Sequence, residues 1–427
     1  MMNIYGKTIP RTQDVSFLRQ SSILDKEIRS NQRGGEPVST GPEVNLDYID
    51  MLRGIAILGV LLVHSTLGLR PSGLSALPFH LEWLLFSGRY AVTLFFVVSA
   101  FTLIRSLHRR TATESRPIFK YFLRRFFRIA PAYYLVLFII FGLKGHGMPD
   151  YVNPLRTSLT WPDLILHLFF LNSFFPYFTN DFIGVEWTIS AEFLFYLLLP
   201  LIFAYIIKES SKLISLLRLV GLYLMSLTIY WVIYFHGVRL QGLGGGFASP
   251  VFAAWSYFFI ASHLHVFIIG IGTWFLVHYG KSDGLRTCAS QIGHWCALYA
   301  LLLLGILIAY IQGYFGWELW SAFAALIFWA LFSAGLVYLF DRLRPSCRPL
   351  TRLGKISFSV YLVHFPIFMR MRDWEGWKGI TPLPEANFLI FQMVGFGVSI
   401  ALAYLLYFCV EIPGIKIGKY LTGELPS

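Results

Sequence analysis

The chain has 427 residues, of which 56% are hydrophobic and only 14% charged, and its mean hydropathy is +0.61. A soluble domain of this length needs far more polar surface, so the composition excludes a soluble globular protein and indicates an all-α polytopic membrane protein. The formal net charge is +12, but Lys and Arg flank apolar segments, which indicates membrane topology rather than binding to nucleic acid. The four cysteines have no paired spacing, so neither a disulfide framework nor a zinc site is indicated.

The N-terminal stretch differs in kind from the rest of the chain. Residues 1–46 are polar and rich in Ser, Gly and Arg, and they contain no apolar core of signal-peptide length. We expect a mostly disordered cytoplasmic tail there. A membrane domain is predicted over residues 47–413, and a short cytoplasmic tail over residues 414–427.

Apolar runs of roughly 17–25 residues predict membrane-spanning helices. We expect about ten of them, at residues 49–69, 83–104, 127–143, 185–207, 213–235, 251–277, 295–312, 317–340, 356–371 and 388–410. An eleventh apolar piece, residues 159–176, is interrupted by Pro162, Asp163, His167 and Asn172.

The distribution of basic residues decides whether this eleventh piece spans. If it does not, and the N-terminus is cytoplasmic, 27 of the 35 Lys and Arg lie on the cytoplasmic side. If it does span, every later loop changes side and the basic stretch at residues 341–355 moves outside. The positive-inside rule therefore favours ten spans with both termini cytoplasmic in the cell's inner or plasma membrane, and a re-entrant or peripheral segment at residues 159–176.

One histidine lies deep inside the first apolar run, YIDMLRGIAILGVLLVHS. Ionisable groups inside a membrane are costly and tend to be functional, although His64 could also make a hydrogen bond between helices. Arg53 precedes it by eleven residues, which places the two within about 20° of one helical face and roughly 16 Å apart along the axis. Asp50 could orient the guanidinium of Arg53. A donor with a phosphate-rich head and a long thin arm could bridge them in one cavity.

Three arginines fall within one turn in KYFLRRFFRIAP. Arg124, Arg125 and Arg128 are a topology signal that contacts lipid phosphates, or else a phosphate-binding patch, because guanidinium groups bind phosphate oxygens bidentately.

The apolar helix predicted in VEWTISAEFLFYLLLP contains Glu192, with Tyr196 one turn later. A carboxylate there is costly unless it is paired or faces water. It is either a structural partner for an arginine or a group that positions a hydroxyl or a proton. Glu186 lies near a helix end, and we expect it at the membrane interface.

A polar stripe at i, i+4, i+7 spacing marks ISFSVYLVHFP. Ser357, Tyr361 and His364 line a cavity or make hydrogen bonds between helices. His263 and His265 are close in sequence, but without a nearby carboxylate they are a weak case for a metal.

In this order the motifs resemble the acyltransferase 3 family of integral membrane acyltransferases over residues 47–413. The family's opening D-x-x-R-G and histidine appear as DMLRGIAILGVLLVH, and its second helix as FFVVSAF, where Ala100 replaces the usual glycine. The family's later motifs follow in the same order, as RRFFRIAP, WTISAEF, SFSVYLVHFP and the closing VEIP.

The resemblance implies transfer of an acyl group, usually acetyl, from cytoplasmic acyl-CoA to a hydroxyl of a cell-surface or lipid-linked carbohydrate. Arg53 and His64 then match the family's essential arginine and histidine, and Glu192 matches its glutamate. Arg53 and the three clustered arginines serve the CoA phosphates, while Asp50, Tyr196, Ser357, Tyr361 and His364 line the substrate cavity. No metal is required, and the oligomeric state stays open.

Other functions remain open on the sequence. A small-molecule acceptor such as a macrolide is the nearest alternative, because acceptor choice lies in unmatched loops. A transporter or flippase for a lipid-linked sugar also needs intramembrane Arg, Glu and His, but only one interrupted segment occurs where such proteins often show a pair. A structural scaffold is the third possibility.

Overall fold

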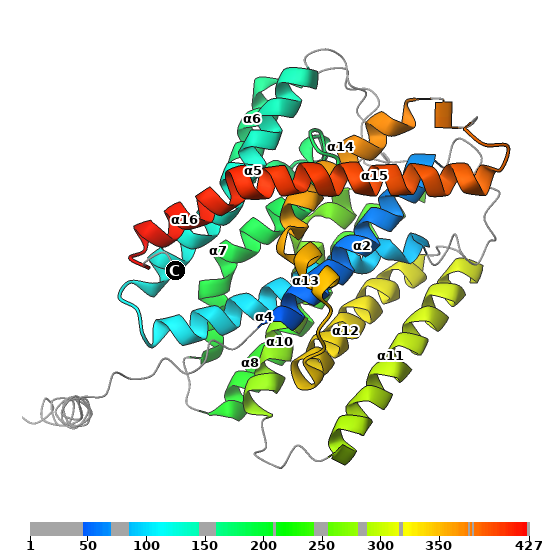
Figure 1. The fold of residues 1–427 in the computed structure, drawn as a ribbon. Coiled ribbons are helices and arrows are strands. Elements are labelled where there is room, and N and C mark those ends of the chain that lie inside the picture. Colours follow the sequence, from blue (N-terminus) through cyan, green and yellow to red (C-terminus); the bar gives the residue numbers. More distant parts are fainter. Residues whose placement is uncertain are drawn as a thin grey trace, which may run out of the picture. The chain divides into compact units, whose positions relative to one another are not determined.

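The computed structural model describes residues 46–69, 85–144, 159–207, 211–242, 255–280, 288–315, 319–374, 376–377 and 380–424. In these ranges all regular structure is helical and no strand occurs (Figure 1). The predicted all-α class is confirmed. The N-terminal tail is predicted at residues 1–46, and all of it before residue 46 lies outside the described residues.

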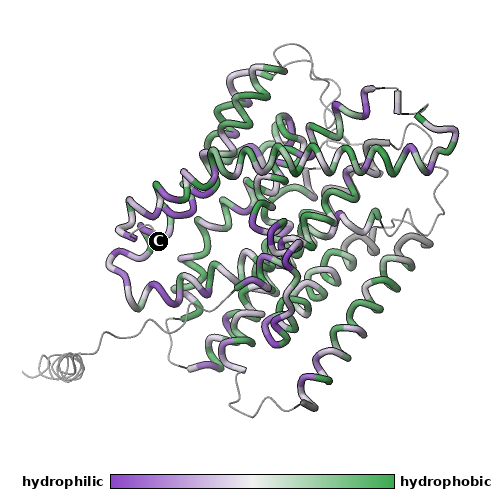
Figure 2. The backbone as a smooth tube through the Cα atoms, viewed as in Figure 1, coloured by the Kyte–Doolittle hydropathy of each residue, from purple (hydrophilic) through white to green (hydrophobic). Residues whose placement is uncertain are grey.

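Within the described ranges, nine helical stretches are long and apolar enough to cross a membrane. They belong to α2 (Asp47–Leu69), α4 (Ala91–Thr111) preceded by η3 (Ser87–Tyr90), α5 (Pro117–Lys144), α7 (Trp187–Ile207), α8 (Lys212–Gly242), α10 (Ile260–Tyr279), α11 (Cys288–Phe315), α12 (Leu319–Leu343) and α15 (Pro384–Leu406). Hydrophobic residues run along most of their length, and hydrophilic residues concentrate near helix ends and connections (Figure 2). The chain is an integral membrane protein.

The remaining predicted span, at residues 356–371, corresponds to α14 (Ser357–Arg372), which has only 16 residues. At about 1.5 Å per residue it is roughly 24 Å long, which is less than the ~30 Å hydrocarbon core of a bilayer. Its last turn carries Arg370 and Arg372, and half of its residues are buried. An apolar run of this length therefore forms a helix held by its neighbours inside the bundle.

The interrupted segment at residues 159–176 forms no long helix. It contains α6 (Trp161–Leu168) followed by the short turns η4 (Asn172–Phe174) and η5 (Pro176–Phe178). The helix α6 starts with a capping box between Thr160 and Asp163. The carboxylate of Asp163 accepts hydrogen bonds from the backbone N–H and the hydroxyl of Thr160. This geometry agrees with the prediction that the piece does not span.

The side chain of Glu186 is fully buried inside the protein. The carboxylate accepts the backbone N–H groups of Phe182 at 2.7 Å and Ile183 at 3.1 Å, and it lies 3.4 Å from Nε2 of His167. A carboxylate just before a helix can accept hydrogen bonds from backbone N–H groups of the preceding loop. Because buried N–H groups need acceptors, the carboxylate is buried together with them.

Helix α2 lies in the middle of the bundle and packs against α4, α14 and the short α13 (Arg348–Lys355). The crossing with α13 is very close: a Cβ at Gly54 would lie 2.1 Å from the carbonyl oxygen of Leu350, and one at Gly354 would lie 1.7 Å from that of Asp50. Only glycine allows this approach. The crossing fixes the end of α2 that carries Arg53.

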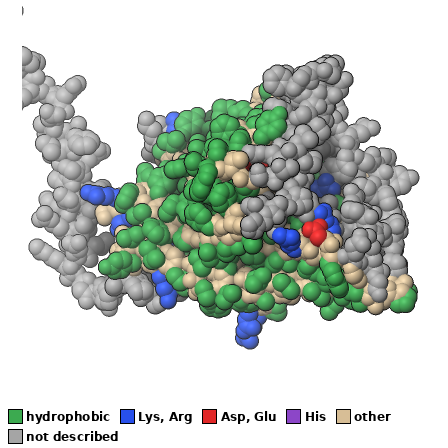
Figure 3. All heavy atoms as spheres, turned by 90° about the horizontal axis from the view of Figure 1, so that it is seen from above, with side chains coloured by type: hydrophobic (Ala, Val, Ile, Leu, Met, Phe, Trp, Pro, Cys, Tyr) green, Lys and Arg blue, Asp and Glu red, His purple; other side chains and the backbone are tan. Residues whose placement is uncertain are grey.

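At the C-terminus α15 continues through a π-helical turn, η7 (Tyr407–Glu411), into α16 (Ile412–Leu421), which packs against α5 (Figure 1). Residues 414–421 of the predicted C-terminal tail are therefore helical. Hydrophobic side chains cover much of the face in Figure 3 that described residues form, as expected for a surface against lipid.

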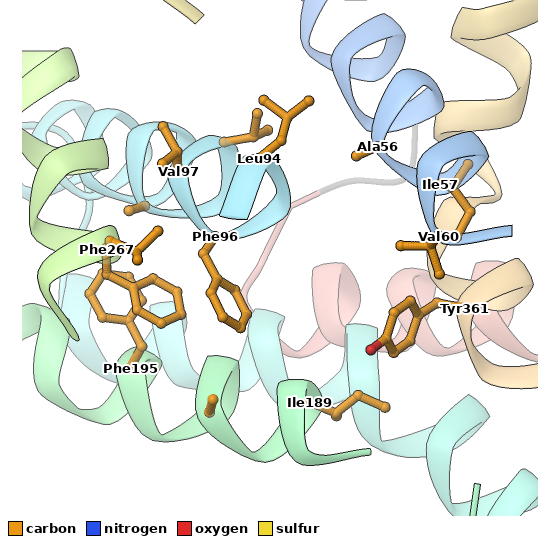
Figure 4. Close-up of a cluster of buried hydrophobic side chains, with 14 of the residues drawn as sticks. Ala56, Ile57, Val60, Leu94, Phe96, Val97, Ile189, Phe195, Phe267 and Tyr361 are labelled. Carbon is orange, nitrogen blue, oxygen red and sulfur yellow. The ribbon is translucent and has the colours of Figure 1, made fainter. Parts of the chain in front are cut away.

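Aromatic rings join the central helices. Phe96 of α4 stacks on Phe267 of α10 with ring centroids 4.5 Å apart, and Phe195 of α7 stacks on the same ring at 4.1 Å (Figure 4). Such pairs contribute beyond the area they bury. They hold α4 and α7 together beside the polar residues described next.

Candidate active site

A small polar pocket lies among α2, α4, α5, α7 and α14, with a volume of about 80 Å³. Its polar lining comes from residues far apart in sequence: Arg53, Ser99, Thr102, Arg125, Arg128, Thr188, Glu192, Tyr196, Ser357 and Tyr361. The structure thus brings together seven of the residues singled out from the sequence. We call this the arginine pocket.

One buried donor in the arginine pocket has no hydrogen-bond partner among the described residues. Arg53 pairs with Asp50 at 3.2 Å, as expected from their spacing. The guanidinium of Arg125 lies 6.0 Å from the ring centroid of Tyr196, and its buried Nε has no hydrogen-bond partner among the described residues. A buried donor without an acceptor is costly, so this arrangement suits an anion that supplies acceptor oxygens.

Arg124 lies one turn earlier on α5 than Arg128 and does not line the pocket. It pairs with Glu114 at 2.9 Å and with Glu424 at 3.1 Å, and Arg110 binds the same two carboxylates. These ion pairs connect the end of α4, the start of α5 and the C-terminal end of α16. The structure therefore separates Arg124 from the two arginines with which it was grouped.

Glu192 has two hydroxyl partners. The hydroxyl of Tyr196 donates to its Oε1 at 2.6 Å, and Ser99 of α4 donates to the same oxygen. Helical spacing does not single out Ser99, although a serine in FFVVSAF is a polar residue in an apolar helix. The carboxylate is thus oriented from two helices beside the arginines.

A second carboxylate faces the same arginines from the far end of the chain. Glu411, in the π-helical turn, is 2% exposed, and its Oε2 accepts the hydroxyl of Ser359 at 2.6 Å. Its charge interacts with those of Arg128 and Arg53. The motif VEIP contains Glu411, but the sequence does not reveal that this residue folds back against α14.

Tyr361 of α14 directs its ring toward α7, beside Ile189 (Figure 4). Its hydroxyl donates to the carbonyl of Val185 at 3.0 Å and accepts from the hydroxyl of Thr188 at 2.7 Å. With both hydrogen bonds made inside the protein, Tyr361 serves as a fixed wall of the arginine pocket.

His64 and His364 form a hydrogen-bonded pair, with Nδ1 of His64 2.9 Å from Nε2 of His364. Nδ1 of His364 lies 2.8 Å from the carbonyl oxygen of Tyr361 and 3.2 Å from that of Val360. Carbonyls only accept, so this nitrogen carries the proton, and in a neutral ring Nε2 is the acceptor. His64 must then donate through Nδ1, which leaves a lone pair on its own Nε2.

The arginine pocket and His64 are connected through side chains rather than by one open cavity. The sequence predicts that Arg53 and His64 face the same cavity, but only Arg53 lines the pocket. Tyr361 lines it too, and its ring centroid lies 5.4 Å from that of His364, which binds His64. The side chain of Tyr361 and the ring of His364 therefore lie on the path between the two.

Residues 46–408 match the family described as the acyltransferase domain, Acyl_transf_3. The chain belongs to this acyltransferase family. The resemblance seen in the motifs is thereby confirmed. The acyltransferase is also similar to the peptidoglycan O-acetyltransferase OatA of Listeria monocytogenes serovar 1/2a (strain ATCC BAA-679 / EGD-e), at 24% identity over 365 residues.

That alignment covers 81% of the acyltransferase chain and 54% of the relative. The chain therefore spans about half the length of this relative. No solved structure matches the acyltransferase. Family membership and the long apolar helices together make it an integral membrane acyltransferase.

Proposed function

We propose that this membrane acyltransferase moves an acetyl group from cytoplasmic acetyl-CoA to a hydroxyl of a cell-surface or lipid-linked carbohydrate. Family membership supports acyl transfer, and the relative's name supports a cell-wall carbohydrate as acceptor. The observation that carries the proposal is the hydrogen-bonded chain from the Tyr361 carbonyl through His364 to His64, which leaves Nε2 of His64 as a base.

The donor binds through its phosphates at the arginine pocket. Arg53, Arg125 and Arg128 supply guanidinium donors, and the unpartnered Nε of Arg125 fits a phosphate oxygen. The pocket's ~80 Å³ is well below the ~300–1,000 Å³ of a typical ligand pocket. It therefore takes a phosphate or the thin pantetheine arm, and the nucleotide lies outside it on the cytoplasmic side, where most Lys and Arg are expected.

The chemistry uses the lone pair on His64. Nε2 removes the proton of the acceptor hydroxyl, the oxygen attacks the thioester carbonyl, and the carbon–sulfur bond breaks. The CoA thiolate leaves and the imidazolium returns the proton to it. In the second version, Nε2 itself attacks the thioester and carries the acetyl group until the acceptor takes it.

The remaining polar residues orient the reacting groups. Glu192 is held by Ser99 and Tyr196 and balances the positive charge of the arginines before the donor binds. Asp50 fixes Arg53, and Ser357 and Tyr361 shape the wall past which the thioester end must travel.

The test compares His64→Ala and Arg53→Ala with the parent at matched membrane abundance. Transfer from labelled acetyl-CoA to surface polysaccharide should fall by about 10²-fold or more in His64→Ala, which is the typical value of a general base. His294→Ala on α11 is the matched control and should keep normal transfer. Normal acetylation in His64→Ala would dismiss the catalytic role of His64.

A further inference from the structure

A second and larger cavity lies farther along α14. It is a groove of about 700 Å³ between α5, α14, α15 with its π-helical turn, and the loop at residues 180–184. Its walls are almost entirely apolar, with side chains such as Ile139, Leu362, Pro366 and Leu405. We call it the apolar groove.

The apolar groove opens toward lipid. On its α5 rim Ile139 and Leu143 are each 51% exposed, and on its α15 rim Leu405 is 61% exposed. These residues belong to helical stretches that are long and apolar enough to cross a membrane. Inside a bilayer such a groove is filled by hydrocarbon, because water in it would leave a large apolar surface hydrated.

The groove reaches the histidine pair. Gly184 has φ of +90°, and a Cβ there would lie 2.3 Å from Cε1 of Phe365, so the loop lets the Phe365 ring lie against its backbone. Phe365 lines the groove and also packs edge-on against the His64 ring, with centroids 5.0 Å apart. One aromatic side chain therefore separates the groove from His64.

One end of the groove carries charge. Arg370 lines it and is exposed, and among the described residues no carboxylate pairs with its guanidinium. Asp373 lines the same end but lies 3.4 Å from Arg372. Six residues of helix, or roughly 9 Å, separate Arg370 from His364. A single anionic group at the end of a hydrocarbon chain would complement Arg370.

We propose that the apolar groove binds the hydrocarbon chain of a lipid-linked acceptor, a polyisoprenyl phosphate glycan, with its phosphate at Arg370 and its sugar at His64. This inference rests on the proposed function, because it assigns the class of acceptor. The acyl chain of a long-chain donor fits less well, since its CoA phosphates bind at the arginine pocket and leave Arg370 without an anionic partner among the described residues. A two-chain phospholipid is the competing occupant that the test must separate.

Binding is tested without requiring transfer. The full-length protein in nanodiscs is exposed to a polyisoprenyl phosphate bearing a photoreactive diazirine, and crosslinked peptides are mapped. We expect crosslinks in α5, α14 and α15 around the groove. Ile139→Trp, which fills it, should reduce them about tenfold, and Arg370→Gln should reduce them similarly through loss of a charge-assisted hydrogen bond.

Two matched controls accompany these variants. Phe138→Trp changes the neighbouring exposed residue of α5, which does not line the groove, and Arg372→Gln changes an arginine that is paired with Asp373. Both should keep the parent's crosslinking. If the control variants lost as much crosslinking as the test variants, the proposal would be overturned.

Competition identifies the occupant. Excess phosphatidylglycerol should leave the crosslinks unchanged, and an unlabelled polyisoprenyl phosphate should remove them. Crosslinks competed away by phosphatidylglycerol, or spread evenly over all helices, would mean that ordinary bilayer lipid fills the groove. Since none of these readouts uses acetyl-CoA, a failed transfer assay would count against the proposed function alone.

Discussion

The arginine pocket and the apolar groove meet at α14, and their walls differ in every respect. The pocket is small and contains three guanidinium groups, one of them paired with Asp50, together with the hydrogen-bonded carboxylate of Glu192. The groove is nearly nine times larger and almost without polar side chains. Tyr361 lines the first and Phe365 the second, while His364 between them binds His64. One helix therefore holds a charged and an apolar compartment on either side of the histidine pair.

The largest expected effect comes from breaking the link between the compartments. His364→Ala removes the acceptor that fixes His64 with its proton on Nδ1, and kcat for acetyl transfer should fall by about 10²-fold. His364→Gln keeps a carbonyl oxygen as acceptor and should recover part of the loss. A purely structural role would lower protein abundance equally in both variants and leave kcat per folded molecule unchanged.

The next effect distinguishes arginines within the charged compartment. Arg125→Ala should raise KM for acetyl-CoA about tenfold, because a charge-assisted hydrogen bond contributes ~1.5–3 kcal/mol. Arg124→Ala is the matched control one residue earlier, because the side chain of Arg124 forms ion pairs with Glu114 and Glu424. Equal increases in KM for Arg125→Ala and Arg124→Ala would show that the donor does not bind specifically to Arg125.

A smaller effect concerns the wall of the apolar compartment. Glu186→Gln should destabilise the protein by about 1 kcal/mol, because the amide turns one acceptor oxygen into a donor facing a backbone N–H. Thermal unfolding in detergent measures this. Glu385→Gln, at the first turn of α15, is the control. An unchanged Tm would mean that the loop at residues 180–184 does not depend on the carboxylate.

The smallest effect lies outside both compartments. Burial alone would raise the pKa of Glu114, but hydrogen bonds and charge from Arg110 and Arg124 outweigh it and hold the pKa below its ordinary value. The ion pairs should stabilise the fold above about pH 4.3, the ordinary pKa of a glutamate, and lose that effect as the pH falls through the lowered pKa.

Glu114→Gln tests this pH dependence. The parent should have a higher Tm than the variant at pH 7, and the two values should converge in acid. The difference at pH 7 is expected to be modest, within the ~1 kcal/mol of partly exposed ion pairs. A gap in Tm that stays constant down to the lowest pH would contradict the assignment.

Much of the candidate site can be predicted from the sequence. Polar groups in apolar helices are costly, which predicts a functional role for seven residues that line a single pocket. They are Arg53, Arg125, Arg128, Glu192, Tyr196, Ser357 and Tyr361. His64 and His364 were selected for the same reason and form a direct pair. Helical spacing groups Arg124 with Arg125 and Arg128. It cannot predict that Glu114 and Glu424, from other segments, form ion pairs with Arg124.

Composition and apolar run length by themselves determined that the protein is an all-helical membrane protein, because a bilayer allows few other ways to satisfy the backbone. The motifs determined the family. Only the tertiary structure decided that α14 is a short interior helix, that Glu186 and Glu411 are buried, and that Phe365 lies between a groove and His64. Those outcomes depend on contacts between residues up to hundreds of positions apart, and the pattern along one helix does not encode its partners.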